Sequence, residues 1–325
     1  MLILRFDMRA PGGAGITDLY STALDMCAWV ETRGAVLAVL SEHHGADDGH
    51  LPTPLLLASA IAARTTQLAI LLAAVPLPLW DTVRLAEEMA VLDILSRGRV
   101  SYALGVGHRA EEYDLFGLDY RRRGVVADAE LPVLLGLLRG ESVEHGGRSI
   151  RVTPRCTTPG GPHVVIAGGS RAAARRAARH GLGFISQAAD DGLVEYYESC
   201  CRAAGTTPGP VQLPVPGAPT AVFVADDVDS AWREIGEYLL HDARAAASYR
   251  PDDDTVASIS RASTVAELRE PGGPYRILTE PEAVEYLRAG RPLPLLPLCG
   301  GMPPETAWPY LERAAAASAA ARQTI

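Results

Sequence analysis

The feature that most constrains this chain is a regular alternation between short apolar runs and stretches with apolar residues at helical spacing. The apolar runs are residues 2–6, 35–40, 68–75, 100–106, 163–167, 183–187, 220–225 and 293–298. The helical stretches are residues 19–33, 53–64, 81–95, 122–139, 170–179, 191–204, 227–247, 280–289 and 304–321. Strands that are apolar throughout are typical of parallel sheets covered on both faces by crossover helices. Eight of them predict an α/β fold of the (β/α)8 TIM-barrel type rather than an open doubly wound sheet.

We expect one domain over residues 1–325, with one interruption. Residues 143–152 fit a small hairpin. Residues 248–278 are polar, contain three consecutive aspartates and a Pro-Gly-Gly-Pro turn, and fall between the seventh strand and the last strand–helix unit. An excursion at this position can fold over the barrel mouth, so we expect an insertion that acts as a lid.

Composition excludes several classes of function. The formal charge of -9 argues against nucleic acid as a partner. The sequence has no lysine and no asparagine, which excludes a Schiff-base lysine, a P-loop and N-glycosylation. Its five cysteines form no C-x-x-C pair and no apolar run is long enough to cross a bilayer. We therefore expect a cytoplasmic protein with reduced thiols and no membrane contact.

The second strand ends in Glu42-His43-His44, at the end of a barrel strand where chemistry is expected. Because side chains alternate along a strand, one histidine should face the barrel mouth while the other points into the surrounding structure. Imidazole is the natural general acid or base at neutral pH, so His43 is the candidate catalytic residue. The two histidines could also simply end the strand. The loop at 47–50 could supply metal ligands, but candidates crowded on one loop are atypical of a metal site, and we predict none.

Small residues mark the ends of the third and fourth strands. Ala73 and Ala74 would let a flat ring lie against the backbone, although a tightly packed barrel rim has the same composition. Gly105 and Gly107 permit a ligand to approach the backbone closely, and Arg109 could meet an anion. A lone G-x-G is a weak signal.

The fifth strand runs into Gly168, Gly169 and Ser170, directly before a helical stretch. This places backbone amides and a hydroxyl at a helix N-terminus, which is a suitable site for a phosphate. The alternative is that Ser170 is an ordinary N-cap and the glycines form a tight turn.

These strand ends, taken in order, resemble the bacterial luciferase-like flavin-dependent monooxygenase family. The resemblance is carried by residues 41–44 (SEHH), 55–65 (LLLASAIAART), 76–78 (PLP), 84–88 (RLAEE), 92–99 (LDILSRGR), 105–107 (GVG), 111–113 (EEY), 116–117 (FG), 167–170 (AGGS) and 299–305 (CGGMPPE). It spans nearly the whole chain, and residues 35–124 are its most specific part.

The resemblance implies an enzyme that binds reduced flavin mononucleotide (FMN) and uses dioxygen to oxygenate a small organic substrate. It implies a catalytic role for His43, a non-proline cis peptide under the flavin ring at Ala73–Ala74, and a phosphate site at the backbone of residues 168–170. The chain departs from the family before its Glu-Glu-Tyr segment, where the connection is short. His108 and Arg109 are the basic side chains available there to contact the phosphate.

Two other functions remain open: a deazaflavin-dependent hydride-transfer enzyme on the same barrel, and a flavin-binding subunit without chemistry of its own. The sequence shows no nicotinamide-binding fingerprint after a strand, so a separate flavin reductase is the expected partner. Related barrels often pair through the helices that flank strands two and three, so we expect a homodimer. The substrate stays open, since an acyl aldehyde, an aromatic polyketide and a small amine are all compatible.

Overall fold

The computed structural model describes residues 1–11, 15–251, 253 and 255–323. Within these residues the main sheet has ten parallel strands: β1 (Leu2–Phe6), β2 (Ala35–Leu40), β3 (Ala69–Pro76), β4 (Val100–Gly105), β7 (His163–Ala167), β8 (Gly183–Ile185), β9 (Val211–Gln212), β10 (Ala221–Val224), β11 (Tyr275–Leu278) and β12 (Leu293–Leu295). Their hydrogen-bonded order is β11-β10-β12-β1-β2-β3-β4-β7-β8-β9. The predicted (β/α)8 barrel is confirmed.

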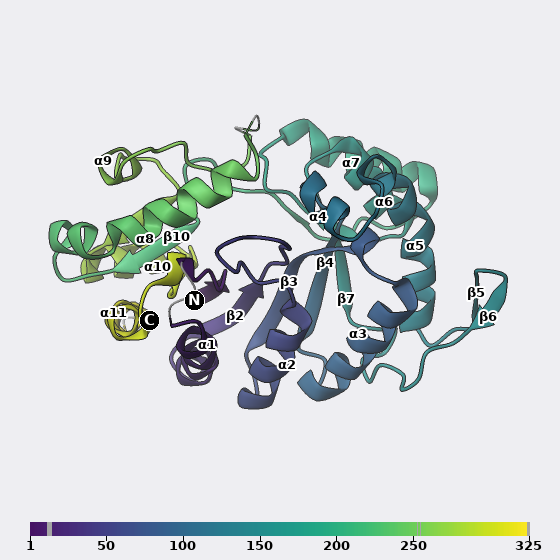
Figure 1. The fold of residues 1–325 in the computed structure, drawn as a ribbon, viewed down its shortest axis with the longest axis horizontal. Coiled ribbons are helices and arrows are strands. Elements are labelled where there is room, and N and C mark those ends of the chain that lie inside the picture. The colour runs from purple at the N-terminus through teal and green to yellow at the C-terminus, as the bar shows by residue number, and fades with distance from the viewer. Residues whose placement is uncertain (12–14, 252, 254, 324–325) are drawn as a thin grey trace.

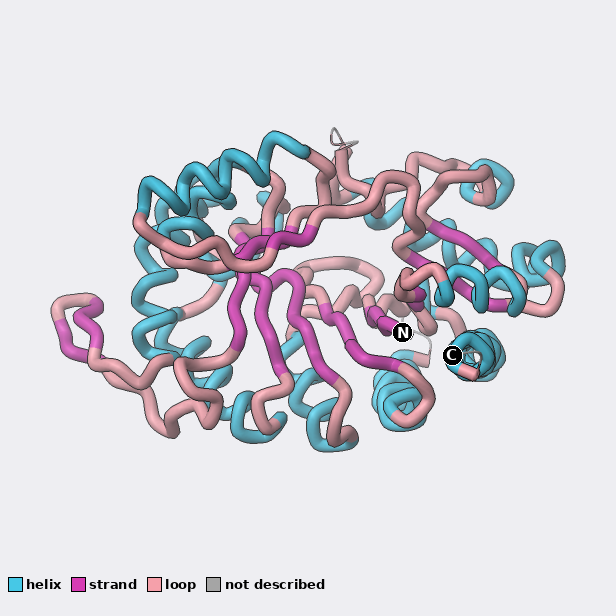
Figure 2. Tube along the Cα trace, turned by 180° about the vertical axis from the view of Figure 1, so that it is seen from behind, coloured by secondary structure: helices cyan, strands magenta, loops and turns pink. Residues whose placement is uncertain are grey.

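Helices connect successive strands and cover the outside of the sheet (Figures 1 and 2). They are α1 (Ile16–Glu31), α2 (Pro54–Arg64), α3 (Thr82–Ser96), α4 (Ala110–Leu115), α5 (Arg123–Leu138), α6 (Arg171–Arg179), α7 (Asp191–Ala204), α8 (Val228–Ser248), α9 (Val265–Leu268), α10 (Glu280–Arg288) and α11 (Pro304–Arg322), with 3-10 turns η2 (Leu77–Leu79), η3 (Tyr120–Arg122) and η4 (Cys299–Gly301). Local chemistry sets several ends. Asp81 accepts from the Arg84 amide before α3 and Asp227 from the Ser230 amide before α8. Each such cap is worth about 1 kcal/mol.

Alternation along β1 shows how the barrel separates core from lumen. Leu2, Leu4 and Phe6 are buried, while the intervening Ile3 and Arg5 are half-buried. Successive strand side chains point to opposite faces. Arg5 lines the central cavity described below, so its face is the lumen. Polar groups on the lumen face of a strand therefore reach the site, whereas the opposite face packs against helices.

The end of the predicted insertion differs from expectation. Residues 275–278 were expected within the insertion, but they form β11, which pairs in parallel with β10 from Ala221↔Tyr275 to Val224↔Leu278. The strand is only four residues long and directly follows a Gly-Pro turn, so its two buried side chains, Tyr275 and Ile277, give too short a pattern to detect. Positions 252 and 254 of the insertion lie outside the described residues.

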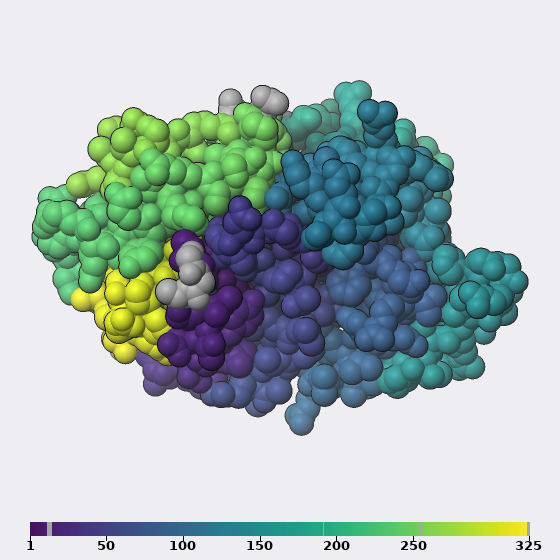
Figure 3. All heavy atoms as spheres, viewed as in Figure 1, coloured from purple at the N-terminus to yellow at the C-terminus, as the bar shows by residue number. Residues whose placement is uncertain are grey.

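Segments distant in sequence meet around the barrel. The predicted hairpin is confirmed: β5 (Val143–His145) pairs antiparallel with β6 (Arg148–Ile150), and Figures 1 and 2 show it projecting from the barrel. The N-terminal and C-terminal segments lie side by side in Figure 3, and Trp29 of α1 contacts Trp308 of α11 edge-on, with centroids 5.6 Å apart. In the described part of the chain, no helix has both the length and the apolar character needed to cross a membrane.

Candidate active site

A cavity of about 530 Å³ opens at the carboxyl ends of the barrel strands. Nine of the ten predicted site residues line it: His43, Ala73, Ala74, Gly105, Gly107, His108, Gly168, Gly169 and Ser170. They come from four different strand ends, which the barrel brings to one mouth. Its volume lies within the range typical of small-molecule and cofactor sites.

One wall of the cavity is built from small residues of β3 and β4. The Ala73–Ala74 peptide bond is cis, at the position implied by the family resemblance. A Cβ at Gly105 would meet the Cβ of Ala74 at 3.3 Å, and Gly107 has a φ of +65°. Larger side chains would fill this space, so the wall offers a flat, apolar surface against which a ring can lie.

The N-terminus of α6 lies next to this wall. Ser170 caps the helix, accepting from the Ala173 amide at 3.2 Å, and the Gly168 amide donates to the Ile185 carbonyl at 2.9 Å. A Cβ at Gly169 would lie 2.7 Å from Ser186 Oγ, so bulk is excluded here. The first amides of a helix have no partner within the helix, and they suit an anion such as a phosphate.

His43 faces the cavity, and a buried carboxylate holds its other side. His43 Nδ1 lies 3.1 Å from Oε1 of Glu112, a residue of α4 that is 2% exposed. The same oxygen accepts from the His44 amide and from Arg109 Nη1, both at 3.1 Å. Because the carboxylate accepts at Nδ1, that nitrogen carries the proton and Nε2 remains the proton acceptor.

The expectation that one of the two histidines faces the barrel mouth and the other does not is confirmed. His44 turns away from the cavity: its Nε2 lies 3.0 Å from Glu42 Oε1, and its ring packs edge-on against Phe116. Glu42 also accepts from Trp80 Nε1 at 2.9 Å. His44 is therefore held within the surrounding structure, and His43 is the histidine of this pair that lines the mouth.

The residues around His43 keep it neutral. Burial lowers the pKa of His43, and the hydrogen bond to Glu112 opposes part of that shift. Burial alone would raise the pKa of Glu112, but the hydrogen bond from His43 and further contacts lower it overall. Burial, with the nearby Arg250 charge, lowers the pKa of His108 to about 3. A neutral imidazole beside an ionised carboxylate is suited to accept a proton.

Arg109 is the predicted site residue outside the cavity lining. Its guanidinium donates to the His44 carbonyl at 3.0 Å and stacks over the Tyr249 ring, 4.0 Å from the centroid. Tyr249 in turn lies 5.2 Å from the His43 ring, centroid to centroid. The arginine thus connects the Glu112 network to the segment that follows α8, rather than pointing at the α6 N-terminus.

The loop at 47–50, which we considered for metal ligands, is tied to protein groups. Asp48 Oδ2 pairs with Arg9 Nη1 at 2.5 Å and lies 3.1 Å from His241 Nε2. His50 Nε2 lies 3.1 Å from Ser41 Oγ. These side chains order the wall of the cavity next to His43.

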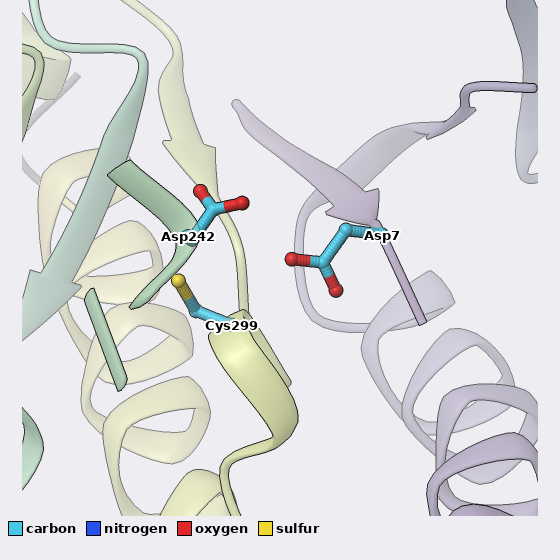
Figure 4. A group of neighbouring side chains, drawn as sticks. All are labelled: Asp7, Asp242 and Cys299. Atoms are coloured by element: carbon cyan, nitrogen blue, oxygen red, sulfur yellow. The ribbon is translucent and has the colours of Figure 1, made fainter. Parts of the chain in front are cut away.

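A second cluster joins Asp7, Asp242 of α8 and Cys299 of η4, which point toward one another in Figure 4. One potential ligand atom of each lies within 4.8 Å of the others. Arg9 Nε sits 3.1 Å from Asp242 Oδ1 and 3.9 Å from Asp7 Oδ2, so a guanidinium already balances these carboxylates. Burial, together with the Asp242 charge, raises the pKa of Asp7 to about 7. We assign no metal to the cluster.

Sequence reasoning gave no role to two residues that contact His43. Glu112 is the second acid of the Glu-Glu-Tyr segment, which we used as part of the resemblance without giving it a role. Tyr249 follows the C-terminus of α8, and no local pattern distinguishes it from any exposed helix end. Glu112 could have been found from its position. It lies in the short helix that follows the fourth strand, and an acid there can reach the histidines at the end of the second strand.

Known proteins resemble this chain in sequence and in fold. The family model described as luciferase-like monooxygenase matches residues 2–284. The chain belongs to the luciferase-like monooxygenase family. A curated relative, the oxygenase component of flavin-dependent trigonelline monooxygenase from Acinetobacter baylyi, is 29% identical over 133 residues, which cover 40% of this chain and 36% of the relative. The match to the first curated relative covers about half the length of each protein.

Two solved structures share the whole fold of this luciferase-like chain. Monooxygenase RslO1 from Streptomyces bottropensis is 19% identical, with a TM-score of 0.76 over 97% of this chain and 98% of that one. The oxygenating constituent of 3,6-diketocamphane monooxygenase from Pseudomonas putida, solved in complex with FMN, is 18% identical, with a TM-score of 0.70 over 98% of both chains. At these identities the likeness establishes the barrel fold.

Proposed function

We propose that this protein is a flavin-dependent monooxygenase that uses reduced FMN and dioxygen to oxygenate a small organic substrate. The observation that carries the proposal is that His43, the small-residue wall and the α6 N-terminus line one cavity. Family membership and flavin-dependent relatives support a flavin as the cofactor. Bound reduced flavin would supply the electrons that activate dioxygen.

The residues present fit FMN. In the proposal Ala73, Ala74 and Gly105 lie against the flavin ring. The amides of Gly169 and Ser170 hold the phosphate, with His108 nearby, because the Gly168 amide is already bonded to the Ile185 carbonyl. His43, oriented by Glu112, accepts or returns a proton through Nε2 at the substrate. Arg109 serves the site through Glu112 and Tyr249.

We further propose that residues 248–274 form a lid. Arg250, Val256 and Ile259 line the cavity, and Ala188 bridges to Val256, so this segment closes one side of the mouth. Water exclusion protects an oxygenation from side reactions. If the segment closes on binding, saturating FMN will slow tryptic cleavage after Arg261, which is followed by Ala262. An unchanged cleavage rate contradicts the lid.

The expected partners are a separate flavin reductase and a second copy of the chain, in the cytoplasm. The trigonelline relative is named as an oxygenase component, which supports a two-component arrangement here. The homodimer would form through α2 and α3, whose outer faces expose Leu56, Val91 and Leu95. Nucleic acid and membranes have no place in the proposal.

Two measurements test the proposal. Titration with FMN and with a deazaflavin shows which cofactor binds, and tight binding of the deazaflavin alone would favour the hydride-transfer alternative. Products formed with reduced FMN and isotopically labelled dioxygen are then followed by mass spectrometry. His43→Ala should lower turnover by ~100-fold while leaving FMN affinity unchanged. Equal turnover in the variant would remove the role of His43, and FMN binding without any labelled product would favour a non-catalytic subunit.

A further inference from the structure

The cavity has two chemically different halves. The half beside β3, β4 and β7 is lined by alanines and glycines and ends at the α6 N-terminus. The opposite half, beside β1, β10 and β12, contains Arg5, Thr220, Ala221 and Leu296. The proposed flavin site takes up the first half, so the second is where a substrate has room.

Arg5 lines that second half from the next-to-last position of β1. It pairs in register with Val39 of β2, and both residues line the cavity. Its Nη1 donates to the Thr220 carbonyl at 3.2 Å. A guanidinium carries five N–H donors in a fixed fork, and the bond to Thr220 uses one of them, so this cavity-lining side chain keeps donors for a ligand.

The other arginines at the mouth differ from Arg5 in one respect. Arg9 pairs with Asp48 and Asp242, Arg109 with Glu112 at 3.1 Å, and Arg250 with Asp253 at 3.0 Å. Across the described residues, Arg5 has no carboxylate partner. A half-buried cation without a counter-ion favours an anion that arrives with a ligand.

The acids in this half of the cavity are already engaged. Asp242 accepts from Arg9 and, at 2.6 Å, from the Tyr275 hydroxyl. Asp7 accepts from the Arg9 amide at 3.1 Å and from the Gly300 amide at 3.5 Å. Among the bonds of the described residues, neither carboxylate pairs with Arg5, so neither neutralises its charge directly.

We propose that the substrate is a small organic acid with an apolar body, whose carboxylate binds Arg5 on the side of the cavity opposite the phosphate site. Val39 and Leu296 supply the apolar surface next to the guanidinium. Held in this way, the body of the acid extends toward His43 and the small-residue wall. The role of the acid as substrate rests on the proposed monooxygenase function, whereas its binding does not.

The test compares acids with amides of the same shape. Benzoate and octanoate are titrated against benzamide and octanamide by calorimetry, with the flavin-free protein and with the protein saturated with FMN. The wild type should bind at least one acid more than ~10-fold more tightly than its amide. Arg5→Met should erase that preference and leave amide and FMN affinity unchanged, while Arg5→Lys should keep part of it.

Arg276→Met is the matched control. Arg276 also lies on a barrel strand and also donates to a backbone carbonyl, that of Gly217 at 2.8 Å, but it does not line the cavity. The control should keep the acid preference. Equal affinity for acids and amides in the wild type, or a preserved preference in Arg5→Met, overturns the proposal. Loss of FMN affinity in Arg5→Met would instead assign Arg5 to the flavin site. Failure to bind FMN would defeat the monooxygenase function and leave the acid measurement readable.

Discussion

At the scale of single residues, Glu112 determines what His43 can do. One buried oxygen accepts from the imidazole, from the His44 amide and from Arg109. It fixes the ring orientation, and its charge raises the pKa of His43 against the effect of burial. In Glu112→Gln that charge is gone, so the pKa of His43 falls.

If neutral His43 is the base, the rate rises with pH through its pKa, so the Glu112→Gln variant should show the acid limb of kcat/KM at lower pH. Turnover should drop by ~10-fold or more because the orientation is less well held. Glu111→Gln, one residue earlier and exposed, is the control. A reduced rate with an unmoved acid limb would mean that Glu112 only supports the fold.

His108 provides a pH test of stability that does not need a substrate. Burial and the Arg250 charge lower its pKa to about 3, whereas the unfolded chain takes up the proton near pH 6.5. The stability that its neutral form contributes is present above pH 6.5 and is lost as the pH falls toward 3. When the pH falls from 7 to 5, His108 lowers the free energy of unfolding of the wild type by about 2 kcal/mol.

His108→Gln should therefore lose less stability on acidification than the wild type. Chemical denaturation at the two pH values measures the difference. His163→Gln, at an exposed position that begins β7, serves as the control and should behave as the wild type. Identical acid sensitivity in His108→Gln would show that this histidine is not held neutral in the folded state.

The residues recovered from the sequence are those whose chemistry follows from a strand end. His43 and Gly168 closely follow a strand, and Ala74 lies two residues before the end of β3, so the barrel rule places them at the mouth. Arg5 was missed because it lies inside a strand. The sequence alone does not show whether its side chain points into the barrel or outward, and only the pairing of β1 with its neighbours decides this. Tyr249 depends on where a 21-residue helix ends in space, which no local pattern encodes.

At the scale of elements, the N-terminus of α6 combines a structural role with the proposed binding role. Ser170 caps the helix through its hydroxyl, and its own amide belongs to the proposed phosphate site. Aspartate is an equally good N-cap but carries a negative charge. Ser170→Asp should keep the melting temperature, weaken FMN by ~10-fold or more and leave riboflavin, which lacks the phosphate, unaffected.

Ser170→Ala separates the capping role of this residue from its proposed role in phosphate binding. It removes the cap, costing about 1 kcal/mol, without adding charge, so FMN should bind nearly as in the wild type. Fluorescence titration with both flavins measures the affinities. Parallel losses for FMN and riboflavin in Ser170→Asp would contradict a phosphate site at this helix end.

Elements with a long, uniform pattern were predictable, and short ones were not. The apolar run at 35–40 needed no tertiary information to be read as a strand, and β2 has those bounds. β11 has four residues and β9 has two, and both exist because a neighbouring strand offers hydrogen bonds. Whether such short strands form depends on the neighbouring strands of the sheet, so the local sequence pattern does not predict them.

At the scale of the whole molecule, the proposed homodimer depends on apolar side chains exposed on the outside of the barrel. α2 and α3 pack against each other, with α2 on β3 and α3 on β4, and their outer faces expose Leu56 (71%), Leu95 (53%) and Val91 (43%). Leaving neighbouring apolar side chains in water costs free energy that a self-complementary interface recovers. A two-fold dimer presents the same patch from both subunits, so one substitution changes the interface twice.

Leu95→Glu places two like charges in that interface and should convert the dimer to a monomer. Light scattering after size exclusion should give twice the chain mass of 34.5 kDa for the wild type and the single mass for the variant. Val215→Glu, at a 69% exposed position away from α2 and α3, is the control and should stay dimeric. Because the site residues of each barrel lie within one chain, the monomer should still bind FMN. A wild type that is monomeric at micromolar concentration, or a Leu95→Glu variant that remains a dimer, would place the subunit contact elsewhere or abolish it.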